Sequence, residues 1–79
     1  MVLRDEIEKL LAETRRQREE AEAEAQHAAE DLMRLASGMT PLQEVDADRV
    51  RAAADTYAEA VQRLRSCEDF ARRLRQLLI

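Results

Sequence analysis

Two side chains in this sequence are of types that carry acid–base or nucleophilic chemistry: the single histidine, His27, and the single cysteine, Cys67. A histidine that acts as a general base needs a residue that orients it and a pocket that holds a substrate. A reactive thiol needs exposure and basic neighbours. Arg63 and Arg65 are close in sequence, but the helical spacing described below directs Cys67 inward. We therefore interpret His27 as a solvated surface residue and Cys67 as a small buried apolar residue, and an intermolecular or redox role of the thiol stays open.

Metal and cofactor chemistry is not indicated by the sequence. A structural zinc site takes about four cysteine or histidine ligands, and only two such residues are present. The acidic run formed by Glu19, Glu20, Glu22 and Glu24 lacks the loop geometry of a calcium site, so we interpret it as a solvated helix face. The sequence has no glycine-rich phosphate loop, nucleophile elbow or zincin motif. We expect no enzymatic activity, cofactor, bound metal or small-molecule substrate.

One basic cluster, Arg72, Arg73 and Arg75, lies near the end of the chain. Basic residues are favourable in the last turns of a helix and can pair with acids nearby, and we favour this interpretation over docking of an acidic partner. The formal net charge of the chain is −4, whereas a protein that binds the nucleic-acid backbone needs a basic surface. No aromatic residue is interleaved for base stacking. We expect no nucleic-acid partner.

The chain that positions these residues has one marked break. Gly38 suits the left-handed residue that ends a helix, and Thr40-Pro41-Leu42-Gln43 has the form of a capping box. A second start signal follows at Asp46, because acids are favourable in the first turn of a helix. We predict helices over about 2–37 and about 46–78, joined by a turn over about 38–45. Two alternatives stay open: a short helical turn at 41–45, and a second helix that starts at Pro41.

Apolar residues on both sides of this break recur in alternating steps of three and four, the spacing of a coiled coil. If the two segments fold back on each other, the numbers of opposite residues add up to 84 or 85, as for Leu10 with Leu74 and Ala28 with Tyr57. The sequence therefore predicts an all-α fold, a two-helix antiparallel coiled-coil hairpin that forms a single domain over residues 1–79. We call the stripe of facing residues the seam; it comprises Leu3, Ile7, Leu10, Thr14, Gln17, Ala21, Ala25, Ala28, Leu32, Leu35, Val50, Ala53, Tyr57, Ala60, Leu64, Cys67, Ala71, Leu74 and Leu78.

Opposite charges flank the seam in this register. Three arginines, Arg15, Arg16 and Arg18, fall near Glu68 and Asp69. Two acids, Glu20 and Glu22, fall near Arg63 and Arg65. In the same way Glu13 falls near Arg72. Each exposed ion pair contributes only about 0–1 kcal/mol, so these charges select the orientation of the helices more than they stabilise the fold.

Several apolar residues lie outside the seam, and a two-helix hairpin cannot cover them all. Ala54 and Val61 flank the seam of the second helix on one side, Phe70 and Leu77 flank it on the other, and Leu11 falls opposite the 70–77 region. Exposed apolar residues in register favour a partner surface. We therefore predict that these five residues form a partner interface.

This interface leads to a functional hypothesis, a non-enzymatic protein–protein interaction module such as a small adaptor, scaffold or chaperone-like subunit. Its hairpin would complete a four-helix bundle, either as a homodimer or with a heterologous helical protein. Only two aromatic residues are present, and a chain this short has little core of its own. The alternative is a coiled-coil spacer or arm that holds other groups apart.

The sequence shows no apolar run long enough to span a membrane and no secretory signal at its N-terminus. A single cysteine forms no internal disulfide. From these features we expect a cytoplasmic protein without a membrane partner.

In length and helical-hairpin pattern, the chain resembles the small E components of type III secretion needle chaperone complexes and other secretion or flagellar export chaperones. The resemblance implies a helical-hairpin co-chaperone as a further alternative. It includes no sequence motif, so it assigns no role to any residue.

Overall fold

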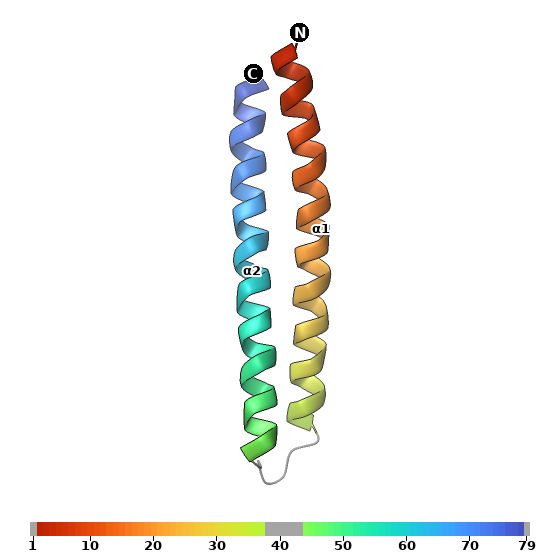
Figure 1. Cartoon of the computed structure of the whole chain (residues 1–79), viewed down its shortest axis with the longest axis vertical. Helices are drawn as coiled ribbons and strands as arrows, with labels where there is room; N and C mark the ends of the chain where they lie inside the picture. The colour runs from red at the N-terminus through yellow and green to blue at the C-terminus, as the bar shows by residue number, and fades with distance from the viewer. Residues whose placement is uncertain (1, 38–43, 79) are drawn as a thin grey trace.

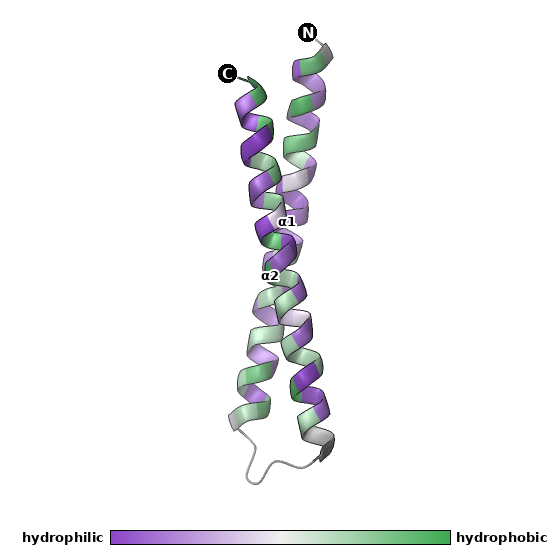
Figure 2. Ribbon diagram, turned by 90° about the vertical axis from the view of Figure 1, so that its left-hand side faces the viewer, coloured by the Kyte–Doolittle hydropathy of each residue, from purple (hydrophilic) through white to green (hydrophobic). Residues whose placement is uncertain are grey.

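Two long helices make up the described part of the computed structural model, which covers residues 2–37 and 44–78. Helix α1 spans Val2–Ser37 and helix α2 spans Glu44–Leu78. They lie side by side and antiparallel in Figure 1, and they cross near their middles in the view of Figure 2. The molecule is a rod with extents of 62 × 15 × 13 Å. The predicted all-α hairpin is confirmed.

The two ends of the rod differ. The open end holds Val2 and Leu78, and the connected end holds Ser37 and Glu44 (Figure 1). Helix α2 begins at Glu44, between the two starts considered from the sequence. The predicted helix-ending glycine and the Thr40–Gln43 capping box lie outside the described residues.

Both helices form from sequences that suit them. Between Val2 and Ser37, and between Glu44 and Leu78, there is no glycine or proline, and Ala, Leu, Arg and Glu, which dominate both segments, have high helix propensity. Exposed ion pairs one turn apart, such as Arg4 with Glu8 at 3.3 Å, add a few tenths of a kcal/mol each. Local preference alone therefore favours two long helices.

The core lies along the predicted seam and is thin. The buried polar residue among the described ones is Thr14, whose Oγ1 donates a hydrogen bond to the carbonyl oxygen of Leu10 at 2.6 Å, so its hydroxyl is satisfied within α1. Five of the seven buried apolar residues are alanines, which contribute little buried area each. The seven are Ile7, Ala21, Ala25, Ala28, Ala60, Ala71 and Leu74.

Ion pairs across the seam report the register. Arg18 Nε lies 3.4 Å from Glu68 Oε1, which is one of the contacts expected between the arginines at 15, 16 and 18 and the acids at 68 and 69, and the numbers of these residues add up to 86. Arg63 was predicted to lie near Glu20 and Glu22, but it forms an ion pair with Glu24. The acid that reaches it lies one turn further along α1, after the four-residue step in the seam between Ala21 and Ala25.

Arg72 was predicted to lie near Glu13 of the other helix, but its ion pair is formed elsewhere. Arg72 pairs with Asp69 of its own helix and not with Glu13 of the other helix. The two residues are three apart and therefore neighbours on the surface of α2. A local pair forms with less loss of side-chain freedom than a pair that bridges two helices.

Some predicted seam residues remain partly in solvent. Tyr57 and Leu10 are each 41% exposed, and Leu3 and Gln17 are exposed as well. Small side chains such as Ala28, the predicted partner of Tyr57, allow close packing of helices, and a seam of this width does not cover a whole tyrosine ring. The prediction that Tyr57 fills the seam was therefore wrong in its degree of burial.

Candidate protein-interaction surfaces

Two grooves follow the seam, one on each side of the hairpin. The first has a volume of about 350 Å³ and is lined near the open end by Leu11, Thr14, Arg15 and Arg18 of α1 and by Cys67, Glu68, Ala71 and Arg75 of α2. We call the side of the rod that carries this groove the Leu11 side. The ion pair between Arg18 and Glu68 spans it.

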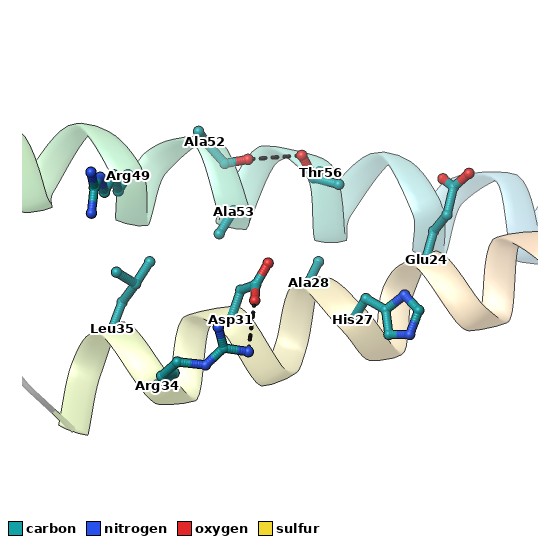
Figure 3. Close-up of a pocket in the computed structure, with 10 residues that line it drawn as sticks. All are labelled: Glu24, His27, Ala28, Asp31, Arg34, Leu35, Arg49, Ala52, Ala53 and Thr56. Atoms are coloured by element: carbon teal, nitrogen blue, oxygen red, sulfur yellow. Dashed lines mark hydrogen bonds and ion pairs between the residues drawn. The ribbon is translucent and has the colours of Figure 1, made fainter.

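The second groove has a volume of about 530 Å³ and lies towards the connected end (Figure 3). We call the side that carries it the His27 side. In Figure 3 the side chains of Ala28, Leu35 and Ala53 point into the space between the helices. The lining residues are Glu24, His27, Ala28, Asp31, Arg34 and Leu35 of α1, with Arg49, Ala52, Ala53 and Thr56 of α2.

The heptad spacing extends each side along the rod, because residues seven apart share a column in a coiled coil. Ala54 and Val61 are in the column of Glu68 and Arg75, which line the groove of the Leu11 side. Phe70 and Leu77 share a column with Arg49 and Thr56 of the His27 side. The five predicted interface residues therefore divide between two opposite sides of the hairpin.

Leu11 belongs with Ala54 and Val61. It lies at the level of residues 67–75 of α2, as the register predicts, but on the side of the seam away from Phe70 and Leu77. Leu11 and Val61 are half-buried, and Ala54 is exposed. The Leu11 side thus offers apolar area that is already partly covered by the hairpin itself.

Larger apolar side chains are exposed on the His27 side near the open end. Phe70 is 43% exposed and Leu77 is 69% exposed. Both neighbour the buried Leu74 on α2, at four residues before it and three after it. In the predicted register Leu10 falls opposite Leu74, and Leu3 lies seven residues before Leu10. We call Leu3, Leu10, Phe70 and Leu77 the terminal patch.

Leu3, Leu10 and Tyr57 are interaction candidates that reasoning from sequence missed, since all three were assigned to the seam. A signal was present for Tyr57, which faces alanines in the predicted register. Met33 is a further large apolar residue that is exposed. Figure 2 shows apolar segments in green and charged segments in purple alternating along both helices, so each helix exposes both kinds of residue.

His27 is exposed, as predicted, and its acidic neighbours are engaged elsewhere. Glu24 pairs with Arg63, and Asp31 pairs with Arg34 at 3.2 Å (Figure 3). None of the ion pairs within residues 2–37 and 44–78 includes His27. The groove therefore presents charges that neutralise one another around the imidazole.

Cys67 lies at the floor of the groove on the Leu11 side and is half-buried. The prediction of an inward thiol is thus correct in direction and too strong in degree. Arg15 and Arg75 line the same groove.

Neither α1 nor α2 has a stretch of the length and apolar character needed to cross a bilayer. No three His, Cys, Asp or Glu residues in the described ranges gather in a way that could hold a metal ion. Comparison of the chain with protein-family models, with curated proteins and with solved structures gives no match.

Proposed function

We propose that this chain is a non-enzymatic protein–protein interaction module, a small adaptor, scaffold or chaperone-like subunit. The observation that carries the proposal is the contrast between its core and its surface. The buried residues are mostly alanine, whereas Phe70, Leu77 and Leu3 are exposed. A hairpin that leaves its larger apolar groups in water gains stability when another protein covers them.

The size of this gain follows from the exposed area. Fully burying a leucine or phenylalanine contributes roughly 1.5–3 kcal/mol relative to leaving it exposed. Phe70 and Leu77 are about half and two-thirds exposed, so covering both supplies on the order of 2–3 kcal/mol. Small domains have total stabilities of only about 5–15 kcal/mol, so association and folding of this chain support each other.

The proposal is tested by replacing Phe70 with glutamate and measuring assembly of the full chain. Sedimentation over a range of micromolar concentrations detects self-association, and affinity co-purification from the native host detects a heterologous partner. We expect Phe70→Glu to weaken whichever assembly forms. Gln62→Glu, at an exposed position outside both grooves of the seam, is the matched control and leaves assembly unchanged.

A compact monomer that melts cooperatively, with helicity independent of concentration and no co-purifying protein, contradicts the proposal. So does an assembly that tolerates Phe70→Glu as well as it tolerates the control.

A second candidate function is a coiled-coil spacer, favoured by the 62 Å length of the rod. A spacer works through its length and tolerates charge on its sides. If Phe70→Glu and Val61→Glu together leave assembly and function intact, the spacer gains over the interaction module.

The proposal includes a cytoplasmic location, with a secretion-type co-chaperone as one form of the same function. Its support is the single cysteine, which forms no internal disulfide and fits a reducing compartment. Fractionation of the native host with an antibody against the chain checks it, and recovery of the chain outside the cytoplasm contradicts it.

A further inference from the structure

We infer that the occupant of the His27 side is a second copy of this chain, packed so that the two open ends lie together and α1 of each copy lies against α2 of the other. This inference rests on the proposed function and names its partner. The product is an antiparallel four-helix bundle whose two-fold axis runs along the rod.

The charges on the two halves of this side are opposite in sign. On α1, seven-residue spacing on either side of the four-residue step at Ala21–Ala25 places five acids along the edge of the seam: Glu6, Glu13, Glu20, Glu24 and Asp31.

Basic residues one turn further out on α1, Lys9, Arg16 and Arg34, offset part of this charge and leave a net charge of about −2 on that half. The α2 half carries Arg49, Arg63 and Arg73 against Glu59, a net charge of about +2.

These charges select one orientation of the second copy. A two-fold axis along the rod places the acidic half of α1 over the basic half of the partner's α2, and this occurs twice by symmetry. At matching levels, Glu13 faces the partner's Arg73. Glu24 and Arg63, which pair within each hairpin, also lie at the level of the partner's Arg63 and Glu24, so the two pairs can join into one network. A two-fold axis across the rod places α1 over α1 and α2 over α2, so that like charges meet, which disfavours that arrangement.

The apolar groups meet in the same arrangement. The terminal patch of one copy, which includes Phe70 and Leu77, covers the terminal patch of the other at the open end. Extents of 62 and 15 Å correspond to a face of roughly 900 Å² per copy, close to the roughly 800 Å² per partner of a standard stable interface. The hairpin is therefore large enough to form a specific dimer through one side.

The opposite side suits a second copy less well. The groove on the Leu11 side contains Arg15, Arg18 and Arg75, with Glu68 as its one acid among the lining residues. A two-fold axis along the rod would place Arg18 over the partner's Glu68, but the lining residues offer no further acid to Arg15 and Arg75, so the net positive charges of the two grooves would oppose each other. Self-association is therefore directed to the His27 side.

The test exchanges charges between copies. We expect the unaltered chain to sediment as a dimer at micromolar concentration, and we expect Glu13→Arg and Arg73→Glu each to weaken the dimer about tenfold because like charges then meet twice. Mixing the two single variants restores both opposite-charge contacts between copies. Within each hairpin, the residues at positions 13 and 73 still carry charges of the same sign. Recovery of dimer on mixing is therefore the expected result.

Two outcomes of the mixing experiment overturn the inference. One is a mixture that stays as weak as the single variants while a chain carrying both changes recovers, because the pair then acts within one hairpin. The other is a dimer whose affinity is unchanged by Phe70→Glu and that is lost with Ala54→Glu, because the partner then occupies the Leu11 side. The second outcome leaves the proposed function standing.

Orientation is measured separately, with spin labels on Asp55→Cys in a Cys67→Ala background. Asp55 is exposed and lies on the outer surface of α2, away from the seam. A two-fold axis along the rod keeps the two labels within about 35 Å, as expected for helices packed at 8–10 Å. A two-fold axis across the terminal patch, near Leu74, separates them by about 57 Å at 1.5 Å per residue.

The longer distance overturns the inferred orientation. A chain that stays monomeric at all micromolar concentrations overturns the inference altogether. In that case co-purification of a heterologous protein sensitive to Phe70→Glu still supports the proposed function, so the two failures are distinguishable.

Discussion

Leu74 and Leu77 of α2 provide a matched test of the hairpin, since they are the same residue type three positions apart with opposite environments. Leu74 is 6% exposed and Leu77 is 69% exposed. Truncation of either residue to alanine removes the same atoms from the same helix, and the change in helix propensity is the same. Any difference in the free energy of unfolding therefore reports burial.

The magnitudes follow from the exposed fractions. Truncation of a buried leucine to alanine costs about 2–5 kcal/mol, and we expect about 2–3 kcal/mol for Leu74 because a thin two-helix seam collapses partly around the missing atoms. Leu77 has about a third of its side chain out of water, so its truncation costs about 0.5–1 kcal/mol on the transfer scale.

The assay is urea unfolding followed by far-UV circular dichroism, at a concentration below that at which the chain associates. Repeating it above that concentration adds the effect of association, and there Leu77→Ala becomes more costly because the terminal patch is then covered. Equal losses for the two variants at low concentration would refute the reasoning, since Leu77 would then be as buried in the hairpin as Leu74.

Two further predictions concern polar residues. Thr14→Val changes the free energy of unfolding by less than about 1 kcal/mol, because the hydroxyl it removes bonds only within its own helix, to the carbonyl of Leu10; thermal unfolding checks this, and a larger loss would show that the hydroxyl serves the other helix. A double-mutant cycle on Arg18→Ala and Glu68→Ala gives a coupling of about 0.2–1 kcal/mol that falls with added salt, because both side chains are about half exposed; a coupling above about 2 kcal/mol would show a desolvated pair.

The helices and their approximate alignment followed from local features of the sequence. A long stretch without glycine or proline favours helix at every residue, and steps of three and four place one stripe on one face. The numbers of facing residues in an antiparallel pair then have a nearly constant sum, which is why the arginines at 15, 16 and 18 were expected near the acids at 68 and 69, where Arg18 pairs with Glu68. Each of these properties depends on residues close together in the chain or on one constant offset.

The exposure of individual side chains depended on the distance between the helices. Ala25, Ala28 and Ala60 are buried, whereas Tyr57 and Leu10 are each 41% exposed although their heptad positions are equivalent, and only the packed structure shows this difference. Heptad positions predict which residues lie in the seam, but they do not give the distance between the two helices.

The partner of Arg63 and the side of Leu11 were also decided by tertiary structure. The four-residue step in α1 rotates the acids after Ala21 relative to those before it, so Glu24 rather than Glu20 reaches Arg63. The same geometry puts Leu11 beside Glu68 and opposite to the side of Phe70. The sequence by itself determined which residues lie along the helix interface and which residues of α2 flank it on opposite sides, because both depend on periodicity. The fold decided how far each side chain is buried and which residues of α1 meet those of α2, because these depend on how closely the two helices pack and how they cross.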